Sequence, residues 1–85
     1  MQIEYPKRFL KAVRNLPLTE QLLLSQRIEI FKNNPKDSRL KTHQLTGKLK
    51  NIYSFSLTYS KRVLFLVDKN KIIFLAVGSH DIYKH

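Results

Sequence analysis

Hydrophobic residues along this chain follow two different periods, and the change falls near the middle of the sequence. Between residues 7 and 34 the apolar positions recur every three or four residues, which is typical of amphipathic helices. The two predicted stripes are Phe9, Leu10, Val13 and Leu16, then Leu23, Leu24, Ile28 and Phe31. Pro17 is expected to end the first helix and Asn34-Pro35 the second. Thr19 is the predicted N-cap of the second helix, with Glu20 in its first turn.

After Gly47 the apolar period becomes two residues, which indicates strands. Apolar or aromatic residues at 53, 55, 57 and 59 alternate with serine or threonine at 54, 56 and 58. The nearly continuous apolar run from Arg62 to Val67 predicts a central strand, with Arg62 on the same face as Leu64 and Leu66. Residues 68–71 read as a hairpin connection and 72–77 as the next strand, while residues 3–5 could form a short first strand.

These elements predict an α+β fold in the order β-α-α-β-β-β, with an N-terminal helical hairpin packed on one face of an antiparallel sheet. The polar stretch from Pro35 to His43 is expected to be a loop or an approach to the sheet. The first strand should pair beside a strand of the later meander, although the sequence does not fix which one. We find no linker or repeat, so residues 1–85 are expected to form a single domain.

The net charge of the chain indicates which kinds of partner it could bind. Sixteen Lys and Arg oppose six Asp and Glu, giving a formal net charge of +10, spread from Lys7 to Lys84. Such a surface favours a polyanion through steering and counterion release, so RNA, DNA, an anionic membrane or an acidic protein are candidates. The alternative is a basic surface without a particular partner. No cysteine, signal peptide or long apolar run is present, which predicts a soluble, cytoplasmic protein that does not enter a membrane.

Three residues at predicted strand boundaries could carry chemistry, namely His43, Arg62 and His80. Histidine transfers protons near neutral pH, and the planar guanidinium of arginine binds phosphate through paired hydrogen bonds. Cleavage of RNA through its own 2′-hydroxyl needs these functions and no metal. Each residue also has a plainer interpretation: His43 as a loop histidine, Arg62 as the exposed start of a one-sided strand, and His80 as a surface histidine in a C-terminal tail.

Further candidates are weaker, and several schemes are disfavoured. Tyr53, Tyr59 and Tyr83 could stack on bases or be half-buried sheet residues. The chain has no Gly-rich phosphate loop, nucleophile elbow or cysteine nucleophile. Its six scattered acidic residues form no convincing carboxylate cluster for two metal ions, so a metal-dependent nuclease is disfavoured and no cofactor is expected.

Taken together, four segments resemble the RelE/ParE superfamily of small bacterial toxins, and most closely its RelE/StbE and YafQ-like branch. The segments that carry the resemblance are residues 41–50 (KTHQLTGKLK), 53–56 (YSFS), 59–65 (YSKRVLF) and 78–83 (GSHDIY). Each motif is short, but their order and spacing are specific, and the resemblance covers nearly the whole chain.

The resemblance implies a microbial RNase-like fold, ribosome-dependent and metal-independent mRNA cleavage, and a cognate antitoxin that forms a hetero-oligomer with the toxin. It assigns His80 as general acid, Arg62 as phosphate clamp and His43 as base or RNA-positioning residue. The supporting RNA-binding candidates are Lys48, Lys50, Lys61, Asp81 and Tyr83. The expected partners are therefore the antitoxin, the ribosome and mRNA.

Departures from the pattern keep two alternatives open. Lys61 stands where an aromatic residue often precedes the arginine, and Ser56 and Ser60 stand where YafQ has a histidine and an aspartate. The division of acid and base roles between His43 and His80 is therefore open. A ParE-like gyrase inhibitor without nuclease activity, or a degenerate toxin that binds only its antitoxin, remains an alternative.

Overall fold

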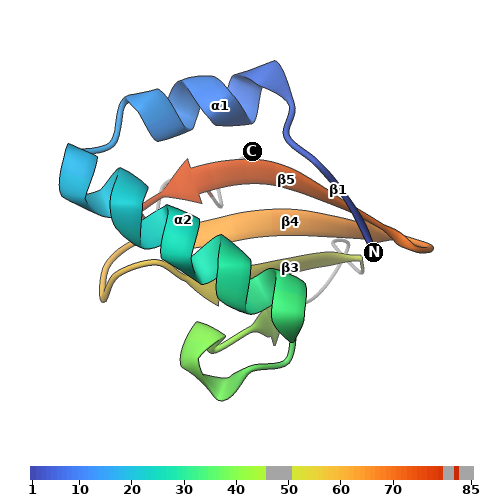
Figure 1. The fold of residues 1–85 in the computed structure, drawn as a ribbon. Coiled ribbons are helices and arrows are strands. Elements are labelled where there is room, and N and C mark those ends of the chain that lie inside the picture. The colour runs from blue at the N-terminus through green and yellow to red at the C-terminus, as the bar shows by residue number, and fades with distance from the viewer. Residues whose placement is uncertain (46–50, 80–81, 83–85) are drawn as a thin grey trace.

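The computed structural model describes residues 1–45, 51–79 and 82. Two helices pack on one face of a five-stranded sheet, which confirms the predicted α+β fold with an N-terminal helical hairpin (Figure 1). The elements are, in order, β1 (Gln2–Glu4), α1 (Lys7–Arg14), α2 (Leu18–Asn33), the 3-10 helix η1 (Ser38–Leu40), β2 (His43–Gln44), β3 (Ile52–Ser56), β4 (Arg62–Asp68) and β5 (Lys71–Gly78). Within the described residues, no helix has both the length and the apolar character needed to cross a membrane.

The sheet is mixed rather than wholly antiparallel, which corrects the prediction. Its strand order is β1-β5-β4-β3-β2, and every pair is antiparallel except β1 with β5. Parallel neighbours need a long crossover, and the whole chain between β1 and β5 supplies one. Ile3 lies opposite Ile72 in this pair, and both pack into the core. Core burial at the two ends of the chain therefore decides a pairing that the local pattern left open.

The stretch from Pro35 to His43 was predicted to be a loop or an approach to the sheet, and it contains two short elements. Leu40 at the end of η1 is completely buried, which anchors this polar segment to the core. His43 and Gln44 then pair with Ser54 and Tyr53 as the edge strand β2. A strand of two residues is too short for a periodic pattern, so only its long-range pairing reveals it.

The boundaries of the helices differ from the prediction in one instructive way. Helix α2 begins at Leu18, and Pro17 occupies the N-cap position, so the assignment of Thr19 as N-cap is wrong. The Pro17 carbonyl accepts hydrogen bonds from the backbone N–H groups of Glu20 and Gln21 at 2.9 and 3.0 Å. Proline has its φ already fixed near the helical value, which suits it to the start of a helix. Glu20 lies in the first turn, as predicted.

The core lies between the helices and the sheet, and all five phenylalanines contribute to it. Phe31 on α2 is its centre: its ring lies 5.5 Å from that of Phe55, 5.0 Å from Phe65 and 5.8 Å from Phe74. Such aromatic pairs add about 0.5–1.5 kcal/mol each beyond the burial of area. Leu10 departs from its predicted stripe, because it reaches the surface while Phe9 beside it is buried.

Candidate functional site

Helices α1 and α2 cover one face of the sheet and leave the other uncovered, and we call the uncovered face the helix-free face (Figure 1). The strand register places His43 and Arg62 on it. Residues directly opposite each other in neighbouring strands point to the same face, and alternate residues of one strand share a face. Phe55 and Val63 face the core, so Ser54, Ser56 and Arg62 face away from it. One row across the sheet is Ser56, Arg62 and Gly78, and the next is His43, Ser54 and Leu64. The predicted orientation of Arg62 is confirmed.

Arg62 is the best-defined group on this face. Its Nε donates to Ser54 Oγ at 2.9 Å, and Nη2 donates to the Lys41 carbonyl oxygen at 2.7 Å and to the Ser54 carbonyl oxygen at 3.3 Å. All three acceptors are neutral, and the described residues include no carboxylate in an ion pair with Arg62. Within the part of the chain that the structure describes, the guanidinium is therefore oriented by neutral acceptors and paired with no carboxylate. A fixed, half-buried cation of this kind suits an anion that arrives from solution.

The two residues that orient Arg62 were not identified from the sequence. Ser54 is a buried polar residue, only 2% exposed, whose hydroxyl faces Arg62. Lys41 contributes its backbone: it adopts a left-handed conformation, with φ 50° and ψ 52°, at the end of η1. Non-glycine residues seldom adopt this region, and they do so where surrounding contacts hold them. The serine alternation in residues 54–58 was a signal for Ser54, whereas nothing in the local sequence marks the Lys41 carbonyl.

His43 joins this cluster through Ser54. It is exposed on the edge strand β2, directly opposite Ser54 and two residues after Lys41. The structure therefore brings His43 and Arg62 to the same face, with Ser54 as their common neighbour. His80, Asp81, Tyr83, Lys48 and Lys50 lie outside the described residues, so their predicted roles remain predictions.

Lys61, another predicted RNA contact, has a structural partner. Its Nζ donates to Glu20 Oε1 at 2.6 Å, which ties the turn between β3 and β4 to the first turn of α2. Both side chains are about one-quarter exposed, at 26% and 23%. Part of the Lys61 charge is therefore used within the protein, in contrast to Arg62.

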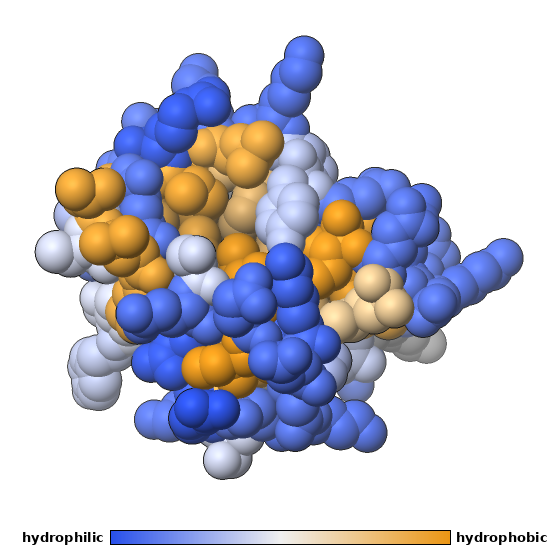
Figure 2. Space-filling model, viewed as in Figure 1, coloured by the Kyte–Doolittle hydropathy of each residue, from blue (hydrophilic) through white to orange (hydrophobic). Residues whose placement is uncertain are grey.

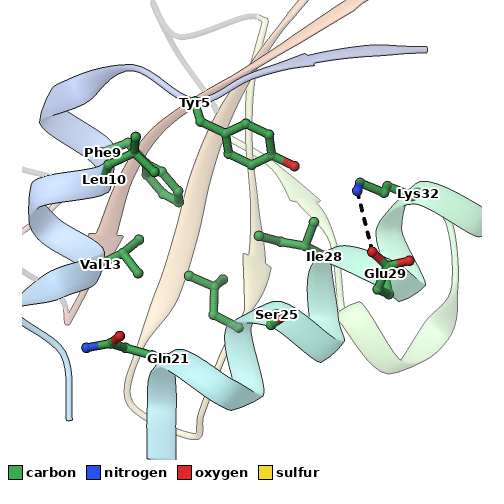
Figure 3. Close-up of a pocket in the computed structure, with 10 residues that line it drawn as sticks. Tyr5, Phe9, Leu10, Val13, Gln21, Ser25, Ile28, Glu29 and Lys32 are labelled. Carbon is green, nitrogen blue, oxygen red and sulfur yellow. Dashed lines mark hydrogen bonds and ion pairs between the residues drawn. The ribbon is translucent and has the colours of Figure 1, made fainter. Parts of the chain in front are cut away.

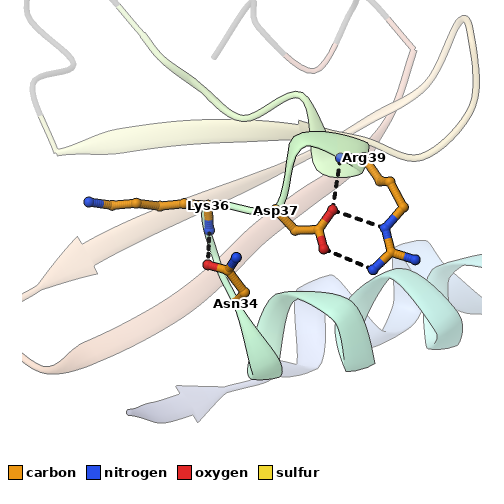
Figure 4. A network of polar contacts seen from close by, with 4 residues as sticks. All are labelled: Asn34, Lys36, Asp37 and Arg39. Atoms are coloured by element: carbon orange, nitrogen blue, oxygen red, sulfur yellow. Dashed lines mark hydrogen bonds and ion pairs between the residues drawn. The ribbon is translucent and has the colours of Figure 1, made fainter.

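The segment that leads into β2 is held by a second polar network (Figure 4). Asp37 accepts hydrogen bonds from the backbone N–H of Arg39 at 2.9 Å and from its Nε and Nη2 at 3.0 and 2.8 Å. The Arg39 side chain is the main reason that the pKa of Asp37 falls to about 2. This network fixes the loop just before Lys41, whose carbonyl meets Arg62.

Gly78 makes room at the other side of Arg62. It lies directly opposite Arg62 in β4, and a methyl group at its Cα would approach Ile82 Cγ2 to 2.9 Å. The Ile82 N–H also donates to the Ser79 carbonyl oxygen at 3.1 Å. Ile82 therefore packs against the end of β5 in the space that a side chain at position 78 would take.

The helix layer carries a feature of a different kind, an open groove of about 270 Å³ between α1 and α2 (Figure 3). Apolar side chains dominate its lining, with Tyr5 and Leu10 partly exposed at its mouth and Leu24 buried below. Figure 2 shows apolar side chains reaching the surface over the helices. Helix α1 also contributes four exposed basic residues and no acidic one: Lys7, Arg8, Lys11 and Arg14. We call this surface the helix groove.

Comparison with known proteins relates this architecture to toxins. No family model and no curated protein sequence matches the chain. Solved structures do match it over nearly their whole length. A YoeB/ParE toxin from Agrobacterium tumefaciens is 14% identical, with a TM-score of 0.78 over 94% of this chain and 99% of that toxin. YafQ from E. coli is 19% identical, with a TM-score of 0.75 over 99% of this chain and 98% of YafQ.

A third similar structure comes from a complex. It is the RelB-RelE antitoxin-toxin complex from Methanococcus jannaschii, matched at 22% identity and a TM-score of 0.77 over 94% of each chain. Identities this low establish a shared fold, and the fold is the same in all three comparisons. The chain therefore has the fold of the RelE/ParE superfamily of toxins.

Proposed function

We propose that this chain is the toxin of a toxin–antitoxin pair and acts as a metal-independent endoribonuclease on mRNA in the ribosome. The observation that carries the proposal is the state of Arg62, a guanidinium held by three hydrogen bonds to neutral acceptors on the helix-free face. The toxin fold and the net charge of +10 support an RNA substrate.

Arg62 would bind the scissile phosphate and stabilise the charge that builds on its oxygens in the transition state. Its hydrogen bonds to Ser54 and Lys41 restrain the guanidinium before substrate arrives, so little reorganisation is needed during the reaction. A preorganised donor of this kind typically contributes about 10²–10³-fold to the rate.

Two histidines would carry the protons. The 2′-oxygen attacks phosphorus and the bond from phosphorus to the 5′-oxygen breaks, leaving a 2′,3′-cyclic phosphate and a free 5′-hydroxyl. One group removes the 2′-hydroxyl proton and another protonates the leaving oxygen. His43 is the candidate base on the same face as Arg62, and the resemblance to YafQ-like toxins assigns His80 as the acid. Each positioned acid or base contributes about 10²–10⁴-fold.

The proposed partner is an antitoxin with an acidic, amphipathic segment. RelE of M. jannaschii was solved together with RelB. In this chain the helix groove offers an apolar floor beside the basic surface of α1, so an apolar stripe flanked by carboxylates would complement it. A second copy of the chain would instead bring two basic surfaces together.

Induced expression followed by mapping of transcript 5′ ends tests the proposed function. The parent chain should cut translated mRNAs in register with codons, and His80→Ala and His43→Ala should each reduce cutting strongly. Growth arrest with intact transcripts and inhibited gyrase would instead identify a ParE-like toxin. Absence of both growth arrest and cutting would identify a degenerate toxin.

A further inference from the structure

The turn between β3 and β4 is braced by several hydrogen bonds and one ion pair. The backbone N–H groups of Leu57 and Thr58 both donate to the Lys61 carbonyl oxygen, at 2.9 and 3.1 Å. The Lys61 N–H donates to Thr58 Oγ1 at 3.0 Å, and Ser56 Oγ donates to the Thr58 carbonyl oxygen at 3.1 Å. Leu57 is buried in the core, and the ion pair of Lys61 with Glu20 attaches the turn to α2.

This braced turn displays one aromatic ring. Tyr59 has a relative exposure of 107%, so its side chain is fully in solvent. The other two described tyrosines have ring partners: Tyr53 stacks on Phe65 at 5.7 Å and Tyr5 meets Phe74 edge-on at 5.4 Å. Within the described residues the Tyr59 ring stacks on no other ring. An aromatic residue of this size is usually at least half buried when it serves the fold.

The position of Tyr59 relates it to the anion site. Ser56 and Arg62 form the last paired residues of the hairpin, and Tyr59 lies between them at its tip. Three residues span at most ~10 Å, so one short segment of single-stranded RNA can reach both Tyr59 and Arg62. We propose that Tyr59 is a stacking platform for an unpaired base of the RNA whose phosphate binds Arg62. This proposal rests on the proposed function, because it takes RNA as the substrate.

The surroundings of Tyr59 favour a base over a protein surface as its partner. Its chain neighbours are Thr58 and Ser60. The other exposed large apolar side chains of the described residues lie between residues 1 and 22, directly before and after β1 and on α1 and α2. Protein contacts usually centre on an aromatic residue enclosed by further apolar contacts. A lone exposed ring near a fixed cation is instead typical of surfaces that bind single strands through stacking and phosphate contacts. The bracing reduces the entropy lost when a base stacks.

The chain contains no tryptophan, so Tyr59→Trp would place the sole indole at this site. The probe is a short single-stranded RNA with a 2′-O-methyl group at every position, which cannot supply the attacking hydroxyl. Binding should quench the indole fluorescence, and replacement of one base by an abasic site should remove most of the quenching. The salt concentration must be constant, since phosphate contacts depend on it.

Affinity measurements on matched variants complete the test. Tyr59→Ala should raise the Kd for the same RNA roughly 5- to 100-fold. Tyr59→Phe should keep the parent affinity, because the ring is retained, and Ser60→Ala in the same turn should change nothing. Parent affinity in Tyr59→Ala, with the indole fluorescence of the Tyr59→Trp variant unaffected by RNA, would overturn the proposal. A loss of antitoxin binding alone in Tyr59→Ala would also overturn it.

Binding and cleavage separate this proposal from the proposed function. Stacking without any transcript cleavage by the parent chain would overturn the nuclease and leave Tyr59 as an RNA contact. Cleavage by the parent chain with RNA binding indifferent to Tyr59 would leave the nuclease and overturn the platform.

Discussion

The helix groove and the helix-free face of the sheet both carry basic side chains, but these side chains are held in different ways. On α1, four basic side chains are exposed beside an apolar groove, and the described residues hold none of them in an ion pair. On the sheet, Arg62 is half-buried and held by three neutral acceptors. The first arrangement tolerates a partner of variable shape, whereas the second fixes one cation for one anion. We therefore expect substitutions at the helix groove to change antitoxin binding and substitutions around Arg62 to change RNA cleavage.

The core that joins both surfaces should give the largest effect. Phe31→Ala removes the ring that contacts three other phenylalanines. We expect the free energy of unfolding to fall by about 3–5 kcal/mol, through lost burial and the cavity left behind. Urea denaturation measures this loss, and Leu22→Ala is the control, since Leu22 is 60% exposed. Equal stability of the two variants would show that the core is assigned wrongly.

Ser54 tests whether the orientation of Arg62 matters for activity. Ser54→Ala removes the acceptor of Arg62 Nε and leaves the charge in place. A hydrogen bond to a charged group contributes about 1.5–3 kcal/mol, so RNA cleavage should fall roughly 10- to 100-fold. Ser56→Ala is the matched control, because the Ser56 hydroxyl lies on the same face but donates to Thr58. If both variants cleave RNA equally well, the proposed orientation has no catalytic value.

Gly78 tests the packing on the other side of Arg62. Gly78→Ala places a methyl group within 2.9 Å of Ile82 Cγ2, and overpacking of this kind costs about 1–3 kcal/mol of stability. Truncation of Ile82 in the double variant Gly78→Ala/Ile82→Ala should remove the clash. A double-mutant cycle by urea denaturation, including Ile82→Ala alone, measures the coupling. Strictly additive losses would contradict the contact.

The helix groove should give the smallest effect on the isolated chain. Leu10 is 41% exposed at the mouth of the groove, so Leu10→Gln should barely alter stability or RNA cleavage. Its affinity for the cognate antitoxin should fall by about 1.5–3 kcal/mol if Leu10 becomes buried in the complex. Calorimetric titration with the antitoxin measures this change, and Leu22→Gln, outside the groove lining, is the control. Unchanged affinity in Leu10→Gln would place the antitoxin elsewhere.

The sequence was informative where structure depends on neighbours along the chain. The alternation around Phe55 and the apolar run after Arg62 predicted two strands and put Arg62 opposite the core, because side-chain direction in a strand has a period of two. The helical stripes predicted the hairpin of helices in the same way. Thr19 shows the limit of local rules, since Pro17 suits the start of α2 and takes the position assigned to Thr19.

The features that could not be predicted from the sequence all depend on contacts between residues far apart in the chain. Strand β2 exists through its pairing with β3, and β1 is parallel because it pairs with the last strand. The Lys41 carbonyl reaches Arg62 across 21 positions of sequence, and the helix groove depends on how far α1 and α2 stand apart. None of these features leaves a periodic signal in the sequence. The site could therefore be predicted as a set of residue types, but not as a geometry.

The proposed role of the oriented Arg62 guanidinium in RNA cleavage is best tested by comparing two arginines of equal charge. Arg62→Ala removes the oriented guanidinium, whereas Arg14→Ala removes an exposed one from the last turn of α1. The measurement is the rate of mRNA cleavage in translating ribosomes supplied with each purified variant, after confirmation that both are folded. We expect a loss of at least about 10²-fold for Arg62→Ala and the parent rate for Arg14→Ala. Equal rates for the two variants would contradict it.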